Sequence, residues 1–313
     1  MQTPLHPLTR KTFLKLRSDY GFKWLFGSAE RAEILKKFLN ALFDGEIVVT
    51  KVDFHDKEVL PPDEDGKRIV YDAYCTTDTD HHFIVEMQQE FTPHFGKRMV
   101  FYMSSGIYRQ GESGKSYNFD PVYMIIITDF NMKPLEEQLV NEVVLMERRT
   151  HVVFTEDVRM YYLSLECVNN EWEKCESEIE RQLYLIKNME KLNKQSQPYL
   201  SGEYDEIFKA AELSSMKKED IVAYSDSIYK EMEMAETLEY NKGLARAEGR
   251  AEGLAQGIAK GITQGIAKGI AQSQKTVAFN LLTLGVDTET ISKATGLSVE
   301  EILTLQSSSS PAF

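Results

Sequence analysis

Two acidic residues, Asp72 and Glu86, stand in two short runs of β-forming residues, 69–76 and 82–88, that a polar segment separates. This arrangement is typical of a hairpin. With the turn centred on Thr79, residues whose numbers sum to 158 lie opposite each other, which places Asp72 opposite Glu86. Carboxylates that face each other repel, and a divalent cation bound by their oxygen atoms would offset that repulsion. A bound divalent metal is therefore the simplest candidate for the group that offsets this repulsion.

The same pattern has a simpler interpretation. Two acids on the polar face of a hairpin are commonly solvated side chains with no ligand, and the register depends on where the turn lies. In either case the even positions carry the acids, and the odd positions of both runs are expected to face a core: Ile69, Tyr71, Ala73, Cys75, Phe83, Val85 and Met87.

A family resemblance strengthens the metal-site interpretation. Asp72, the 13 residues that follow it and Glu86-Met87-Gln88 resemble the signature of the PD-(D/E)XK nucleases, with Gln88 where lysine is commonest. The wider order of motifs is similar to one branch, the Rpn-type recombination-promoting nucleases, also known as PD-(D/E)XK nuclease family transposases. Residues 17–130 carry the resemblance closely and the repetitive tail more loosely. Its motifs are Asp19-Tyr-Gly-Phe-Lys23-Trp-Leu-Phe-Gly27, Phe38-Leu-Asn40, Val85-Glu-Met-Gln88 and Arg98-Met-Val-Phe-Tyr102.

The resemblance implies an α/β fold with a restriction-endonuclease-like PD-(D/E)XK core, in the order αβββαβ around a mixed sheet. It also implies a DNA endonuclease that depends on Mg²⁺, with Mn²⁺ or Ca²⁺ as alternative ions. Asp72, Glu86 and the main-chain carbonyl of Met87 would bind the metal, and Gln88 would take the catalytic position of the lysine. Glutamine can orient water, but it carries no positive charge to stabilise a developing anion.

Other residues near these motifs have two interpretations each. Lys23 or Arg98 could supply the missing cation and contact DNA phosphate. Tyr102, one helical turn after Arg98, is either a further phosphate contact or a core residue. Glu33 matches a position from which an acidic residue often joins the metal site in such nucleases, and is otherwise a surface residue. Asp19 either orients Lys23 four residues on or caps its helix.

Composition restricts the setting of this chemistry. The net charge of −13 argues against a surface that coats DNA broadly, although residues 1–37 carry eight Lys and Arg against three acids. No apolar run approaches the ~20 residues that span a bilayer, so no membrane partner is expected. The three cysteines have neither zinc spacing nor an even disulfide framework, which favours a reducing cytoplasm.

The elements expected around the site follow the order helix, three strands, helix and strand. A buried strand after the second helix completes a strand–helix–strand crossover, which predicts a parallel pair. Helices are predicted over 28–43 and 93–110, strands over 47–52 and 122–128 beside the hairpin, and further β-segments over 151–154 and 160–165.

The chain is predicted to divide into four parts: a PD-(D/E)XK nuclease-like domain over 1–168, an acidic helical region over 169–242, a stalk over 243–273 and a small helix-turn-helix-like tail over 274–313. An internal linker is expected at 191–202. The last three parts form the predicted helical C-terminal extension.

A glycine recurs every four residues from Gly249 to Gly269. Small residues at this spacing let two helices approach closely, which favours a helical stalk that makes the protein a homo-oligomer. Low-complexity disorder is the alternative, because each helical glycine costs ~1 kcal/mol relative to alanine. The final helix of the tail is acidic and lacks side chains that read bases, so an assembly role is favoured there over DNA reading.

Two functions of different classes fit these observations. The first is a metal-dependent DNA endonuclease linked to recombination or to mobile-element and phage DNA processing. The second is a catalytically weak or inactive nuclease-fold protein that acts as an oligomeric DNA-binding or regulatory module, which Gln88 and the acidic composition favour. A true transposase is a third possibility, but the carboxylate pair contains no information about strand joining.

Overall fold

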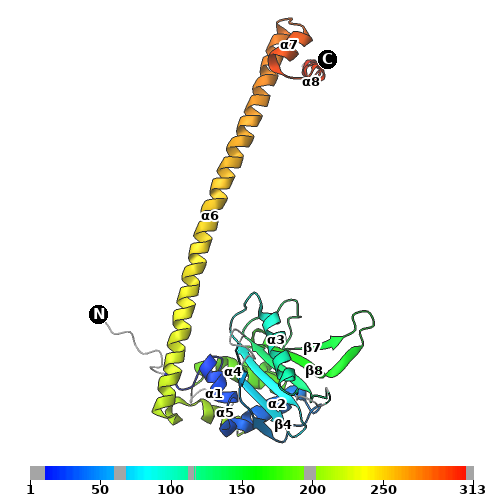
Figure 1. The fold of residues 1–313 in the computed structure, drawn as a ribbon. Coiled ribbons are helices and arrows are strands. Elements are labelled where there is room, and N and C mark those ends of the chain that lie inside the picture. Colours follow the sequence, from blue (N-terminus) through cyan, green and yellow to red (C-terminus); the bar gives the residue numbers. More distant parts are fainter. Residues whose placement is uncertain (1–10, 60–67, 112–115, 117, 194–201, 308–313) are drawn as a thin grey trace, which may run out of the picture. The chain divides into compact units, whose positions relative to one another are not determined.

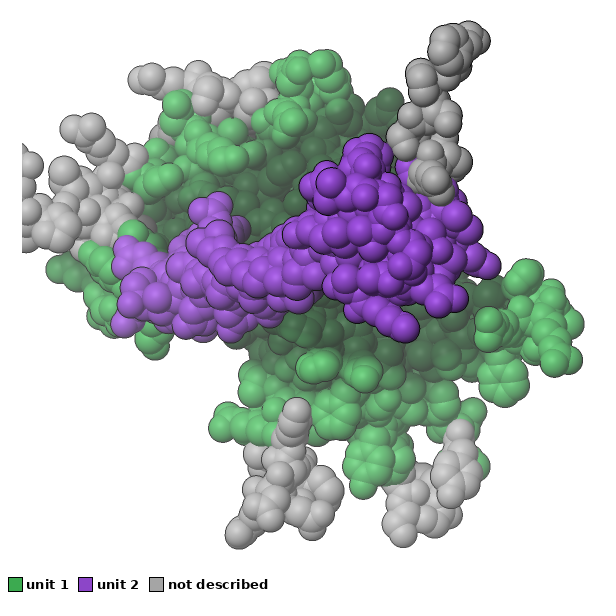
Figure 2. Space-filling view, turned by 90° about the horizontal axis from the view of Figure 1, so that it is seen from above, with its two compact units in different colours: residues 1–232 green, residues 233–313 purple. Residues whose placement is uncertain are grey.

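The computed structural model describes residues 11–59, 68–111, 116, 118–193 and 202–307 of the 313-residue chain. The chain forms two compact units, residues 1–232 and residues 233–313 (Figure 2). The first unit is a mixed α/β structure built on one large sheet, and the second is helical (Figure 1).

The large sheet has six strands in the order β1-β4-β5-β6-β8-β7. Strands β4, β5 and β6 form its centre, with β4 antiparallel to β5 and β5 parallel to β6. This is the mixed sheet of the predicted αβββαβ core. The bounds are β1 Val52–Phe54, β4 Ala73–Thr77, β5 His82–Gln88, β6 Val122–Thr128, β7 Val140–Met146 and β8 Val153–Ser164. Two short strands, β2 (Glu58–Val59) and β3 (Ile69–Val70), pair separately.

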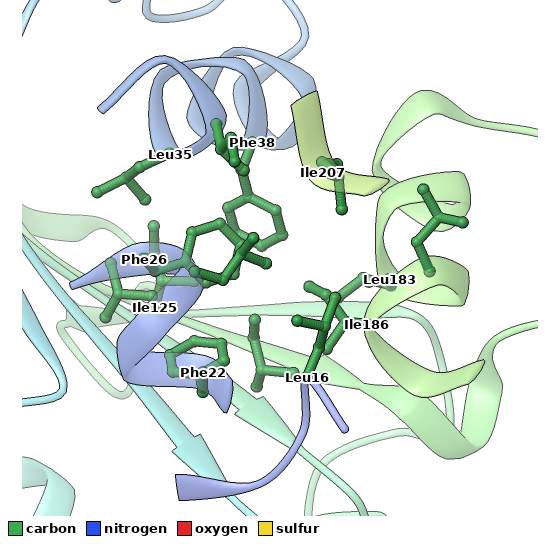
Figure 3. Packing of buried hydrophobic residues seen from close by; sticks show 14 of the residues in the cluster. Leu16, Phe22, Phe26, Leu35, Phe38, Ile125, Leu183, Ile186 and Ile207 are labelled. Carbon is green, nitrogen blue, oxygen red and sulfur yellow. The ribbon is translucent and has the colours of Figure 1, made fainter. Parts of the chain in front are cut away.

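Helices cover both faces of the sheet. The larger core cluster joins the odd-numbered side chains of β5 and β6 to helices on one face, and Figure 3 shows Ile125 of β6 among them. The even-numbered side chains of these strands pack against α3 (Phe95–Tyr108) on the other face. The helices of the first face are α1 (Asp19–Phe26), α2 (Ala32–Phe43), α4 (Glu178–Asn188) and α5 (Asp205–Ala211). Short 3₁₀ turns lie at Ala29–Arg31, Leu165–Cys167, Trp172–Lys174, Met189–Lys191 and Leu213–Ser215.

One helix of 66 residues, α6 (Lys218–Thr283), begins in the first unit and contains the whole glycine repeat. It crosses the predicted boundary at residue 243 without a break, and the division into four parts stays a prediction. Beyond α6, the helices α7 (Thr288–Thr295) and α8 (Val299–Ser307) pack on its end around Ala278 and Ile291. Asp287 caps α7 at its start, and Gly296 at φ 75° ends it in the left-handed conformation that glycine adopts freely.

The hairpin register predicted from the turn is confirmed. Ala73 pairs with Val85 and Thr76 with His82, so the residue numbers of each pair sum to 158. The expectation of one strand over 69–76 is wrong, because the strand breaks at Asp72 and its first residues belong to the β2–β3 pair. Ile69 and Tyr71 therefore join Tyr74 in the core under α3 rather than the odd-numbered face. The face formed by the even-numbered residues of the hairpin, expected to be polar, is also covered, by α3.

The strand predicted over 47–52 is also wrong, since β1 starts only at Val52. The Asn40 side chain both donates to the Val49 carbonyl and accepts from the Val49 N–H, each at 2.8 Å. Asp78 accepts hydrogen bonds from the N–H groups of Thr50 and Lys51. These side chains satisfy the backbone groups that a strand partner would otherwise have paired.

The remaining elements follow the prediction with changed limits. The helix expected over 28–43 becomes a 3₁₀ turn, capped by Ser28, and then α2. The β-segments at 151–154 and 160–165 are parts of the single strand β8, and β7 beside it was not predicted. The linker expected at 191–202 lies mostly outside the described residues. Within the described residues, no helix is both long enough and apolar enough to cross a bilayer.

The Asn40 contacts generate a stability prediction. Asn40→Ala removes both bonds to Val49 and leaves two backbone groups in need of partners, so the free energy of unfolding should fall by about 1–3 kcal/mol. Urea unfolding of the full chain measures it. Lys37→Ala on the same helix loses only an exposed ion pair with Glu206 and should change stability by less than about 1 kcal/mol. Equal midpoints for the two variants would contradict this account of the loop.

Candidate active site

Asp72 and Glu86 are held together by hydrogen bonds to each other's backbone. The Asp72 N–H donates to Glu86 Oε1 at 3.1 Å, and the Met87 N–H donates to Asp72 Oδ2 at 2.9 Å. These bonds continue the β4–β5 pairing by one step, with side-chain oxygen atoms in place of main-chain ones. The acids are therefore neighbours at the carboxyl end of β5, as the hairpin register predicted.

Both acids are buried, and burial opposes the ionisation of each carboxyl group. Asp72 is 8 % exposed and Glu86 3 %. Burial raises the pKa of Glu86 well above its usual value, and the charge of Asp72 raises it further. Burial likewise raises the pKa of Asp72, against the lowering effect of Lys23. Two adjacent carboxylates that resist ionisation together form a site that a cation would stabilise.

Helix α1 places a cation against this pair. Ser18 caps the helix by accepting a hydrogen bond from the Gly21 N–H. Lys23 Nζ lies 2.6 Å from Asp19 Oδ1 and 3.5 Å from Asp72 Oδ1. Asp19 therefore orients Lys23, as one of the two interpretations held, and Ser18 rather than Asp19 is the cap.

Helix α3 contributes Arg98, which contacts Gln88 rather than open solvent. An Arg98 guanidinium NH₂ group donates to Gln88 Oε1, and the Arg98 Nε is buried without a partner among the described residues. Gln88 Nε2 makes no hydrogen bond to a described residue and is left to donate elsewhere. Arg98 thus contacts Gln88 in the structure, and a direct contact of Arg98 with phosphate stays a prediction.

Tyr102 and Glu33 have different outcomes. Tyr102 is half-buried beside Tyr71, whose hydroxyl donates to the Tyr102 carbonyl. Burial raises the pKa of Tyr102, and the charge of Glu86 raises it further. Glu33 is an exposed residue that pairs with Lys36 at 2.5 Å. Among the described residues, no group of three or more His, Cys, Asp or Glu side chains could hold a metal, so Glu33 does not join Asp72 and Glu86.

Sequence reasoning missed Lys57, which lies in the loop before β2. The Tyr71 N–H donates to the Lys57 carbonyl at 2.9 Å, so Lys57 sits beside the backbone that leads into Asp72. A Cβ atom added at Gly27 would lie 2.4 Å from Lys57 Nζ and 2.5 Å from the Lys23 carbonyl oxygen. A glycine is therefore required at position 27, because Lys57 and the backbone of Lys23 approach it closely. This glycine was the one signal in the sequence that could have indicated a close neighbour here.

The first turns of α6 contact the start of α1. Glu231 accepts hydrogen bonds from the Asp19 N–H at 3.1 Å and from Gln89 Nε2 at 3.2 Å, and it pairs with Lys15 at 2.7 Å. Residue 231 thus links the start of α1 to the residue that follows Gln88.

Comparison with protein families decides the classification. The model of the PD-(D/E)XK nuclease family transposases matches residues 16–241, which is well over half of the chain. The chain belongs to this family. The match extends beyond the sheet to include α4, α5 and the first turns of α6, so the support that Glu231 gives to α1 lies within the family region. Neither the curated proteins nor the solved structures gave a significant match.

The raised pKa of Glu86 in this family member generates a pH prediction. At pH values above the glutamate pKa of the unfolded chain, about 4.3, and below the raised folded-state pKa, the folded protein holds a proton that the unfolded chain has lost. Its stability therefore falls as pH rises through that window. Glu86→Gln keeps an acceptor for the Asp72 N–H but cannot ionise, so in EDTA it should be more stable than the native chain at pH 8.

The measurement is urea unfolding of both proteins between pH 4 and pH 8. The advantage of Glu86→Gln should shrink toward pH 4, where both proteins carry an uncharged side chain at this position. A difference that stays constant across this range, or a variant that is less stable at pH 8, would show that Glu86 ionises in the folded protein without cost.

Proposed function

We propose that this protein is a divalent-metal-dependent DNA endonuclease that hydrolyses phosphodiester bonds. The observation that carries the proposal is the buried Asp72–Glu86 pair at the end of β5, beside a glutamine that a guanidinium orients. Membership of a PD-(D/E)XK nuclease family supports the nuclease class and DNA as the substrate. Mg²⁺ is the expected ion, with Mn²⁺ or Ca²⁺ as alternatives.

The donor atoms of the pair fit a hard divalent cation. Each carboxylate uses one oxygen in a backbone hydrogen bond. The other oxygen atoms, Glu86 Oε2 and the Asp72 Oδ1 that pairs with Lys23 at 3.5 Å, would bind the ion. Together with the Met87 carbonyl they would hold the ion. Mg²⁺ commonly takes only one or two carboxylates and completes its shell with water and substrate phosphate. A bound ion would polarise the scissile phosphate and lower the pKa of a coordinated water molecule.

Residues of the chain around this centre orient the reacting groups and balance the charge of the acids. Gln88, fixed through its oxygen by Arg98, presents its amide N–H groups to a water molecule or to a phosphate oxygen. The positive charge of Lys23 offsets the negative charges of Asp72 and Asp19, and so holds these side chains together before substrate binds.

A second candidate is an oligomeric DNA-binding or regulatory module with weak or no catalysis. The neutral Gln88 and the net charge of −13 favour it. Under either function, a role in recombination or in mobile-element and phage DNA processing stays a prediction from the family resemblance. Residence in the cytoplasm stays a prediction from the cysteine pattern.

Self-association through α6 is part of the proposal. Leu254, Ile258, Ile262, Ile266 and Ile270 are each more than half exposed. A Cβ atom at any glycine of the repeat would meet nothing within 4 Å in the single chain. Each glycine weakens an isolated helix by ~1 kcal/mol relative to alanine, so this composition is explained by a second helix that packs closely against α6.

The catalytic assignment predicts loss of cleavage on substitution of either acid. Asp72→Ala and Glu86→Gln should each slow plasmid nicking in Mg²⁺ by about 10²–10³-fold or more, because each removes an electrostatic element of the site. Agarose gels of supercoiled plasmid with Mg²⁺, Mn²⁺, Ca²⁺ or EDTA measure it. Glu33→Gln is the matched control and should cleave at the native rate.

Two outcomes would contradict this assignment. Cleavage that survives both substitutions would remove the pair from the active site. DNA binding without cleavage in every metal, by the native protein, would favour the module over the enzyme.

The assembly proposal predicts a change of mass. A chain that ends at Gly243 should form a smaller particle in light scattering than the full chain, because the exposed aliphatic stripe is gone. The full-length pair Gly257→Leu and Gly261→Leu should also assemble less well, although leucine favours helix more than glycine does. Lys260→Gln on the same helix should leave the mass unchanged. An unaltered mass for the shortened chain would rule out α6 as the assembly element.

A further inference from the structure

Lys57 is a third cation near the acidic pair, and its position differs from those of Lys23 and Arg98. Its ammonium group packs over Gly27 at the end of α1, where the Asp72 carbonyl oxygen also approaches. Burial lowers the pKa of Lys57, while the nearby charge of Asp72 raises it and that of Lys23 lowers it. Lys57 therefore lies close to the acidic pair, although it belongs to none of the sequence motifs.

The other cations of the site are already engaged. Lys23 bonds Asp19 and lies near Asp72, and Arg98 donates to Gln88. Among the described residues, Lys57 Nζ has neither a hydrogen bond nor an ion pair, and yet it is half-buried. A half-buried ammonium without a bonded counter-ion has lost hydration that an arriving anion would replace.

We propose that Lys57 forms a phosphate-binding site and donates a hydrogen bond to a non-bridging oxygen of the scissile phosphodiester. The inference rests on the proposed nuclease function and supplies the positive charge that Gln88 lacks. In the reaction, a water oxygen bonds to phosphorus and one P–O ester bond breaks. The attacking water releases one proton to solvent, and the leaving oxygen takes up one proton from solvent. Lys57 keeps its proton throughout and stabilises the charge that builds on the phosphoryl oxygens.

The kinetic test compares Lys57→Gln and Lys57→Arg with Lys51→Gln in the full chain. Lys51 is an exposed residue of the same region, paired with Asp53 at 2.7 Å, and serves as the matched control. Lys57→Gln should lower kcat for duplex cleavage in Mg²⁺ by about 10²–10³-fold with a smaller change in KM, and Lys57→Arg should recover part of the loss. Lys51→Gln should leave both constants unchanged.

A second measurement needs no cleavage. The full-length protein is acylated with an amine-reactive reagent, with and without inorganic phosphate or a short DNA duplex, in Ca²⁺ and in EDTA. Mass spectrometry then quantifies the label at each lysine. The probes should protect Lys57 several-fold and leave Lys51 unprotected.

The outcomes separate this inference from the proposed function. If the native chain cleaves nothing in any metal, the nuclease proposal fails, and protection of Lys57 by phosphate still decides whether the anion site exists. Unprotected Lys57 overturns the inference. A Lys57→Gln protein that cleaves with native kcat overturns it as well, and a lower unfolding midpoint with unchanged kcat would show that Lys57 is only a counter-ion for Asp72.

Discussion

The exchange of hydrogen bonds between Asp72 and Glu86 and each other's backbone is the constraint on which the site depends. It ends the regular ladder at Asp72 and fixes two carboxylates side by side in the protein interior. Burying adjacent acids costs free energy unless positive charge accompanies them. The lysines of the neighbouring elements offset this cost with their positive charge. The metal that the family suggests would offset it in the same way.

Four separate elements supply the surroundings of this pair. Helix α1 contributes Lys23, the loop before β2 contributes Lys57, β5 contributes Gln88 and α3 contributes Arg98. Other residues position these side chains. Arg98 donates to Gln88, Asp19 pairs with Lys23, and the absence of a side chain at Gly27 leaves space for Lys57. An acidic protein in this way concentrates cations around one buried acidic pair.

The sequence predicted the parts of this arrangement that are local. Side-chain alternation and a polar turn were sufficient for the hairpin register, and helical spacing for α2 and α3. The limits of β1 could not be predicted because Asn40 replaces a strand partner through its side chain. Lys57 belongs to no motif and lies beside the backbone before Asp72, next to the β2–β3 pair. The contact of Glu231 with Asp19 joins residues 212 positions apart, which no local pattern records.

The four-residue repeat of α6 has a consequence for any partner that lies along it. A shift by one repeat, about 6 Å of helix, presents almost the same surface again. The middle of the helix therefore offers several equivalent alignments and cannot distinguish between them. Only the non-repeating ends, the packed turns of α7 and α8 at one end and the residues before Gly249 at the other, can fix a unique register.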